Sequence, residues 1–263
     1  MDERWFEPFD ALRSPEPLIF CFPHAGADAG GYLGWQDRVG DEARLVAVRL
    51  PGRGARAEEA AAPDLAGLAD AAAGVILGYA GAPVVLFGHS FGALLAFEVA
   101  RRLDAAGRLR YLVASGCAAP SVLPSDYLRW AAGLDRRAFA EAAGAFGSVP
   151  PEVLTDEDLQ DLLLTDLRAD VRLMAEYRYR PAPPLNAGVS LVNGRADQYV
   201  EPAALEPWRR ECLAPPSYHW AGGGHFYFQR QPGAVVDVLR AAVRHAPVPD
   251  GPAHPAGEHV EVI

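Results

Sequence analysis

Val84-Val85-Leu86-Phe87-Gly88-His89-Ser90-Phe91-Gly92 is the stretch that decides the fold of this chain. Its first four residues form a short apolar run typical of a buried strand, and a helical pattern covers residues 91–106. Between the two lies G-x-S-x-G, the motif of a serine held on a strained strand-to-helix turn. The glycines keep the neighbouring backbone clear of the serine, whose hydroxyl projects above the sheet. This context predicts that Ser90 is a nucleophile.

Other short apolar runs alternate with helical patterns along the chain. The predicted strands are residues 18–22, 45–48, 84–87, 111–114, 189–192 and 217–220, and the predicted helices between them are residues 64–79, 91–106 and 232–244. Continuous apolar runs are typical of strands covered on both faces, and their alternation with helices favours right-handed crossovers. The predicted fold class is therefore α/β, with a mostly parallel central sheet flanked by helices.

One segment, residues 121–180, interrupts this alternation because it contains helical patterns and no clear strand. The expected helices are residues 126–133, 135–144 and 155–179. Ligands of open α/β sheets bind at the carboxyl ends of the strands, so we expect this insertion to form a lid there. A helical elaboration without a role is the alternative. We expect a single domain over residues 1–246 and a disordered, Pro-rich tail over residues 247–263.

Composition excludes several classes of protein. The 263 residues are 50% hydrophobic and 22% charged, which is typical of a chain with a large core and excludes global disorder. The formal charge of 24 − 34 = −10 argues against a nucleic-acid-binding protein, which needs a basic face.

The cysteines and the apolar runs predict the cellular compartment of the protein. Cys21, Cys117 and Cys212 are widely spaced and odd in number, so we expect neither a disulfide framework nor a metal site, and a reducing cytosol fits best. The N-terminus lacks an apolar signal core, and no apolar run approaches the ~20 residues that span a bilayer. We expect a soluble, cytoplasmic protein without a membrane partner.

A nucleophilic serine needs a base, and His225 is the best placed of the seven histidines. It lies in Gly222-Gly223-Gly224-His225-Phe226, after the last predicted strand, and glycines let such a loop approach the serine closely. We expect His89 to point away along the turn and His219 to be structural.

An acid should orient the base, and Asp197 follows the predicted strand of residues 189–192. It would accept a hydrogen bond from His225 Nδ1, which fixes the tautomer and stabilises the imidazolium formed in turnover. Glu201 is the nearby rival, and a turn or helix N-cap is the alternative role for Asp197.

Two backbone amides should stabilise the oxyanion of a tetrahedral intermediate. One belongs to the residue after the nucleophile, Phe91, and the other to a loop after an earlier strand, where Ala25 is our choice. His24 has no second metal ligand at suitable spacing, so we expect it to hold this loop. The Gly-rich segment Pro51-Gly52-Arg53-Gly54-Ala55-Arg56 is either a loop at the rim of the site or an ordinary solvated turn.

Together these motifs resemble the type II thioesterases that work beside polyketide synthases and nonribosomal peptide synthetases. The resemblance covers about residues 16–245 and rests on Phe22-Pro23-His24-Ala25-Gly26, Pro51-Gly52-Arg53-Gly54, Gly88-His89-Ser90-Phe91-Gly92-Ala93, residues 162–170, residues 179–185, Gly194-Arg195-Ala196-Asp197 and Gly223-Gly224-His225-Phe226. Two departures are Ala27-Asp28, where the family often has Gly and a small residue, and Tyr227, where a second Phe is common.

The resemblance implies a monomeric α/β-hydrolase with a helical lid. Members of the family hydrolyse acyl thioesters from the phosphopantetheine arm of acyl or peptidyl carrier proteins, and so remove stalled or misprimed acyl groups. By this resemblance Ser90, Asp197 and His225 are the triad, and Ala25 and Phe91 supply the oxyanion amides. No metal or organic cofactor is needed.

The lid is expected to limit the size of the acyl group. Tyr127 and Phe226 are the predicted substrate-binding residues, and other aromatic or apolar candidates are Leu123, Trp130, Phe139 and Phe146. The alternative is that the lid residues only pack helices together. Docking of an acidic carrier protein would need basic spots, for which the candidates are Arg136, Arg137, Arg178 and Arg180.

Other functions remain open at this level. A carboxylesterase or lipase acting on free esters would use the same triad, and product release with macrocyclisation is a third enzymatic alternative. A non-catalytic protein that only binds an acyl ligand is the alternative outside catalysis.

Overall fold

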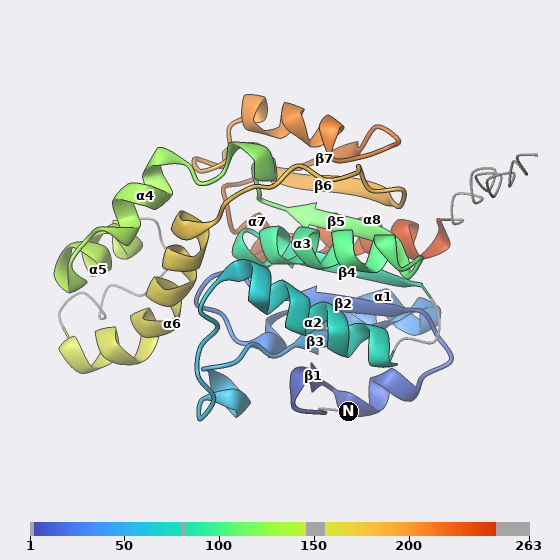
Figure 1. Cartoon of the computed structure of the whole chain (residues 1–263), viewed down its shortest axis with the longest axis horizontal. Helices are drawn as coiled ribbons and strands as arrows, with labels where there is room; N and C mark the ends of the chain where they lie inside the picture. The colour runs from blue at the N-terminus through green and yellow to red at the C-terminus, as the bar shows by residue number, and fades with distance from the viewer. Residues whose placement is uncertain (1–2, 80–82, 146–155, 246–263) are drawn as a thin grey trace, which may run out of the picture.

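The computed structural model describes residues 3–79, 83–145 and 156–245, and within them seven strands form one sheet (Figure 1). The strands are β1 (Phe6–Glu7), β2 (Leu18–Phe22), β3 (Arg44–Val48), β4 (Val84–His89), β5 (Leu109–Ser115), β6 (Gly188–Gly194) and β7 (Ser217–Ala221). Their order is β1-β3-β2-β4-β5-β6-β7, and every pairing is parallel except that of β1 with β3. All six predicted strands are present, whereas the two-residue β1 is too short to leave a periodic pattern.

Helices cover both faces of the sheet. They are α1 (Gln36–Val39), α2 (Leu65–Tyr79), α3 (Phe91–Ala105), α7 (Tyr227–Arg230) and α8 (Gly233–Arg244), and α2 and α3 lie on the opposite face from α1 and α8 (Figure 1). Helix α2 begins as predicted, because the Asp64 carboxylate accepts a hydrogen bond of 2.7 Å from Gly67 N–H.

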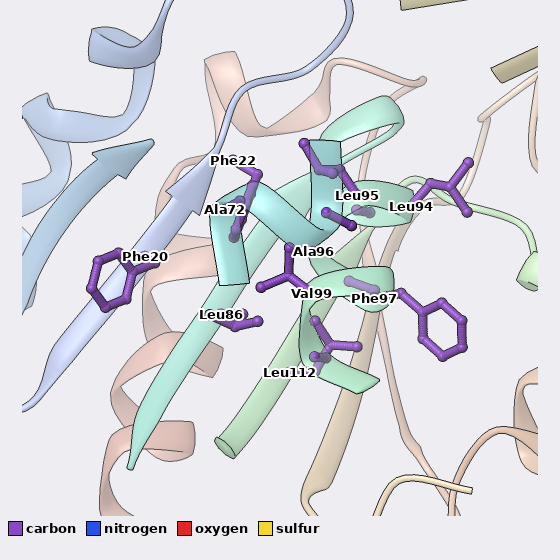
Figure 2. Close-up of a cluster of buried hydrophobic side chains, with 14 of the residues drawn as sticks. Phe20, Phe22, Ala72, Leu86, Leu94, Leu95, Ala96, Phe97, Val99 and Leu112 are labelled. Carbon is purple, nitrogen blue, oxygen red and sulfur yellow. The ribbon is translucent and has the colours of Figure 1, made fainter. Parts of the chain in front are cut away.

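Alternate strand residues bury themselves on opposite faces, which explains the continuous apolar runs. On one face Phe20 and Leu86 pack against α2 and α3, and Figure 2 shows them with Phe97 of α3. On the other face Ile19 and Val85 join the cluster that includes α8. Every residue of β2 and β4, the strands that lead to the candidate site, is therefore buried.

The strand predicted at residues 217–220 differs from the others. As β7 it is the edge of the sheet and pairs only with β6, and Tyr218 and Trp220 are 41% and 37% exposed. The expectation of burial on both faces is therefore wrong for this strand. An aromatic run does not distinguish an edge strand from a central one.

The helical insertion between β5 and β6 contains α4 (Asp126–Ala132), α5 (Arg136–Ala145) and α6 (Glu157–Glu176), beyond the carboxyl ends of the strands (Figure 1). Its own buried cluster is small: Phe139, Ala140, Ala143 and Leu164. The predicted lid helices are confirmed, with α6 ending three residues earlier than expected. The predicted tail, residues 247–263, lies outside the described residues. None of the described helices has both the length and the apolar character that a bilayer span requires.

Candidate active site

Ser90 lies on a strained turn between β4 and α3. With φ of 53° it is the one non-glycine residue with positive φ among the described residues. A Cβ on Gly88 would lie 2.1 Å from the carbonyl oxygen of Gly92, and a Cβ on Gly92 would lie 2.4 Å from that of Phe22. Ser90 N–H also donates to Ser115 O at 2.8 Å, which ties the turn to β5. Both glycines are therefore sterically required, as the motif predicted.

Asp197 and His225 come together from two loops at the same end of the sheet. His225 Nδ1 lies 2.8 Å from Asp197 Oδ2, with the aspartate side chain fully buried and the histidine 9% exposed. The other carboxylate oxygen of Asp197 accepts the Tyr199 N–H at 2.8 Å. Because an ionised carboxylate only accepts hydrogen bonds, the contact places the ring proton on Nδ1 and leaves Nε2 as the basic nitrogen. Glu201, the rival acid, is exposed.

The two loops approach each other through glycines. Ala196 N–H donates to Gly223 O at 2.9 Å, and Arg195 N–H donates to Ala221 O at the same distance. A Cβ on Gly194 would lie 2.3 Å from the carbonyl oxygen of Gly224. Only a glycine at position 194 allows this approach, so the loop sequence is a condition for the contact between the acid and the base.

A cavity of about 660 Å³ joins Ser90 and His225 to the helical insertion. Tyr127 and Phe226, the predicted substrate-binding residues, both line it. Of the other candidates Leu123 and Phe139 line it as well, whereas Trp130 is 52% exposed and Phe146 lies outside the described residues. Three wall residues on α6 were not among the predicted candidates, although their helical spacing was a usable signal: Leu167, Val171 and Met174.

The predicted oxyanion amides belong to segments that touch. Ala25 and Gly26 line the cavity beside Ser90. The first turn of α3 packs on the loop that carries them, because a Cβ on Gly92 would also lie 2.5 Å from Pro23 O. First-turn amides such as that of Phe91 have no acceptor within their own helix, so they are available to an anion.

This geometry agrees with the comparisons with known proteins. The sequence profile of the family described as "Thioesterase domain" matches residues 17–243. The chain belongs to the thioesterase family. The thioesterase is 33% identical over 226 residues to thioesterase TesA of Mycobacterium marinum. The matched region covers 84% of this chain and 89% of TesA. Over 242 residues it is 33% identical to antimetabolite synthetase AmbE of Pseudomonas aeruginosa, covering 90% of this chain but only 11% of AmbE.

Solved structures give the same result for the fold. BorB, a type II thioesterase from the borrelidin biosynthetic cluster, has a TM-score of 0.82 and 30% identity to this thioesterase over 93% of this chain and 99% of BorB. The fold is that of the α/β-hydrolases, as expected.

His89 of the thioesterase lies closer to the base than we expected. Its buried ring packs 4.6 Å from that of His225, measured between ring centres, and its Nδ1 lies 2.8 Å from Ser115 Oγ. Burial, followed by the proximity of His225 and His24, holds the pKa of His89 well below its ordinary value. The ring of His225 therefore packs against a neutral ring.

The hydroxyl of Tyr227 completes this arrangement and explains one departure from the family pattern. It lies 2.7 Å from Ser115 Oγ and 3.2 Å from Val192 O. A carbonyl only accepts, so Tyr227 donates to Val192, Ser115 donates to Tyr227, and His89 Nδ1–H donates to Ser115. The chain of hydrogen bonds thus fixes the tautomer of His89.

The histidine of the 24–27 loop is structural, as predicted. His24 Nδ1 lies 3.0 Å from Tyr32 Oη. Burial, together with repulsion from His225, lowers the pKa of His24 to about 4, so this ring is neutral at pH 7. The second departure from the family pattern, Asp28, caps the next helical turn by accepting the Ala29 N–H at 2.7 Å.

The Gly-rich segment after β3 is not an ordinary solvated turn. Arg53 is 8% exposed and forms a two-pronged ion pair with the fully buried Asp170 of α6, at 2.7 and 2.5 Å. The loop therefore contacts α6 of the helical insertion, although residues 51–56 are not among the described residues that line the cavity.

Proposed function

We propose that this thioesterase hydrolyses acyl thioesters on the phosphopantetheine arm of an acyl or peptidyl carrier protein, through a Ser90–His225–Asp197 triad. The observation that carries the proposal is the buried 2.8 Å contact between His225 Nδ1 and Asp197 Oδ2, with His225 and Ser90 on one cavity wall. The similarity to BorB, from a biosynthetic cluster, supports a role in polyketide or nonribosomal peptide biosynthesis.

The chemistry follows from the positions of the groups. His225 Nε2 takes the proton of Ser90 Oγ, and this oxygen attacks the thioester carbonyl. The oxyanion accepts hydrogen bonds from the Ala25 and Phe91 amides until the C–S bond breaks, and the pantetheine sulfur leaves as a thiol with the proton that His225 took from Ser90. Water then gives a proton to His225 and attacks the acyl-serine. When the C–O bond to Ser90 breaks, His225 returns this proton to Ser90 Oγ and the carboxylic acid is released.

The helical insertion supplies the acyl chamber in this proposal. The part of the wall that the insertion contributes consists mainly of apolar side chains of α4, α5 and α6. Such side chains suit an acyl chain better than a charged substrate. The role would be removal of stalled or misprimed acyl groups. The monomeric state and the cytoplasmic location stay predictions.

Docking of the carrier protein would place its arm at this chamber. Among the arginines considered for docking, Arg137 is 89% exposed and pairs with Glu141, while Arg178 donates to backbone carbonyls at the end of α6. Arg180 is exposed. Charge reversal of Arg137 and Arg180 should raise KM for an acyl-carrier protein but not for acyl-pantetheine; an unchanged KM removes this docking surface.

Substitution of the nucleophile tests the proposal. Ser90→Ala should lower kcat for hydrolysis of an acyl-carrier protein about 10⁵–10⁶-fold. The hydrolysis is measured from the intact mass of the carrier protein. Ser217→Ala, on the exposed edge strand, is the matched control and should behave as wild type. Turnover near the wild-type level in Ser90→Ala overturns the proposal.

Two further measurements separate the alternatives. A higher kcat/KM on a p-nitrophenyl ester than on a carrier protein with the same acyl group would assign a carboxylesterase instead. Failure of Ser90 to react with a phosphonate probe would indicate a protein that only binds acyl groups.

A further inference from the structure

The loop of residues 24–27 is held by a carboxylate of the helical insertion. Asp170 Oδ2 accepts the backbone N–H of Gly26 at 2.9 Å, the residue directly after Ala25. The same oxygen accepts Arg53 Nη1 at 2.7 Å, and Asp170 Oδ1 accepts Arg53 Nη2 at 2.5 Å. One buried side chain thus joins α6, the loop after β2 and the loop after β3.

Packing leaves this loop little freedom to move relative to α6. Gly26 has φ of +71°, and a Cβ there would lie 2.8 Å from Leu167 Cβ. Leu167 precedes Asp170 by one helical turn and lines the cavity. The backbone of the loop therefore lies directly on the helix, and the hydrogen bond to Asp170 sets its orientation there.

The charges of this contact are balanced. Burial raises the pKa of Asp170, whereas Arg53 and the Gly26 amide oppose that rise by stabilising the ionised carboxylate. Arg53 is itself only 8% exposed, so neither charge is screened well by solvent. The pair thus holds the loop with a carboxylate whose charge directly faces the guanidinium of Arg53.

A purely structural role is a poor explanation of such a pair. A buried ion pair costs desolvation energy, and replacement by well-packed apolar residues is often neutral or stabilising. An apolar pair cannot accept a hydrogen bond from Gly26 N–H. This hydrogen bond sets the orientation of the loop that carries the Ala25 amide. Orientation matters because oxyanion donors stabilise the transition state only when they lie within about 2.7–3.1 Å of the oxygen.

We propose that Asp170 is a positioning residue for the oxyanion hole, which it holds in place through the Gly26 amide and the ion pair with Arg53. Helix α6 then contributes to the stabilisation of the transition state as well as to the wall of the acyl chamber. This inference rests on the proposed function, in which the Ala25 amide binds the oxyanion.

Two double variants with neutral side chains separate hydrogen bonding from charge. Arg53→Met/Asp170→Leu removes the acceptor for Gly26 N–H and should lower kcat about 10–100-fold with KM within about threefold. Arg53→Gln/Asp170→Asn keeps an oxygen acceptor at position 170 and should recover most of kcat. Affinity for a trifluoromethyl ketone analogue of the acyl-pantetheine, which forms an oxyanion on Ser90, should fall in parallel with kcat/KM.

A matched control separates positioning from stability. Tyr177, directly after α6, donates a buried hydrogen bond of 2.8 Å to Glu98 of α3, away from the 24–27 loop. Tyr177→Phe should lower Tm and leave kcat unchanged. If Arg53→Met/Asp170→Leu does not fold, Arg53→Gln/Asp170→Ala removes the acceptor with less bulk and has the same expected kcat.

The outcomes distinguish this inference from the proposed function. A folded acceptor-free variant with kcat within twofold of wild type overturns the inference, as does an equal kcat loss in Tyr177→Phe. Either result leaves the proposed function standing if Ser90→Ala is still inactive. Turnover that persists in Ser90→Ala overturns the proposed function itself.

Discussion

The sheet and the helical insertion differ in how firmly they hold their residues. The sheet side has two large buried clusters, one on each face, whereas the cluster of the insertion has four fully buried residues. Ser90, Asp197 and His225 all follow strands of the sheet, whereas the insertion supplies a large apolar part of the cavity wall. Groups that must be fixed to fractions of an ångström lie on the rigid part, while the wall that contacts a variable acyl chain has less support.

After the loss of Ser90 itself, the largest effect should come from the proposed acid on the sheet side, Asp197. Asp197→Asn should lower kcat about 10⁴-fold, because the asparagine no longer fixes the tautomer of His225 or stabilises its imidazolium. Glu201→Gln, at the rival acid, which is exposed where it lines the cavity, should lower kcat far less. The reverse pattern of kcat values would assign the acid to Glu201.

A pair of phenylalanines compares the two regions directly. Phe97 of α3 packs edge-on against Trp208, with 5.3 Å between ring centres, and Phe97→Ala should cost about 3–5 kcal/mol of unfolding free energy. Phe139 of α5 borders the cavity, so Phe139→Ala should cost only about 1–3 kcal/mol.

Activity should separate the same two variants. Phe139→Ala enlarges the chamber and should lower KM for bulkier acyl groups, whereas Phe97→Ala should leave the acyl preference unchanged. Urea unfolding and an acyl-carrier panel give the two measurements. Equal stability losses with equal acyl preferences would remove the distinction between the two regions.

Acid should weaken the sheet side through its buried histidines. In the folded chain the pKa of His24 is about 4 and that of His89 is well below its ordinary value, whereas both titrate near 6.5 when unfolded. Below pH 6.5 the unfolded chain therefore binds protons that the folded chain does not. The stabilising contribution of His24 is complete above pH 6.5 and is lost as the pH falls towards 4, by up to about 1.4 kcal/mol per pH unit.

The test is the slope of the unfolding free energy against pH between pH 7 and 5, which reports how many protons the chain takes up on unfolding. His24→Gln should lower this uptake by about one proton. His245→Gln, at a solvent-exposed side chain, should leave the slope unchanged. An unaltered slope in His24→Gln would contradict the assignment.

The smallest effect should come from Tyr227, whose hydroxyl only supports the ring beside the base. Tyr227→Phe removes the acceptor of the Ser115 hydroxyl and one of two donors to the Val192 carbonyl, which keeps the Gly116 N–H at 2.9 Å, and it should cost about 1–2 kcal/mol of unfolding free energy. Its kcat should fall no more than a few-fold. A loss as large as that of Asp197→Asn would show that the network takes part in the chemistry.

Local signals explain why the turn at Ser90 and the meeting of Asp197 with His225 were predictable from the sequence. The motif around Ser90 predicts a strand, a turn and a helix within ten residues, and the geometry of the strained turn follows from its glycines. His225 and Asp197 each follow a recognisable strand, so the order of the chain placed them at one end of the sheet. The two-residue β1 and the exposure of β7 were missed, because pairing partners rather than local sequence decide both.

Local sequence was enough to predict the central strands and helices, the strained turn at Ser90 and the loops that carry Asp197 and His225, since periodicity and glycine placement act over a few residues. Other contacts exist only in the folded chain: Arg53 meets Asp170 across 117 positions, Gly26 meets it across 144, and His89 packs on His225. Such contacts depend on how the helical insertion and the strand-end loops pack over the sheet. No short segment records that packing, because its free energy is shared among residues far apart in the chain.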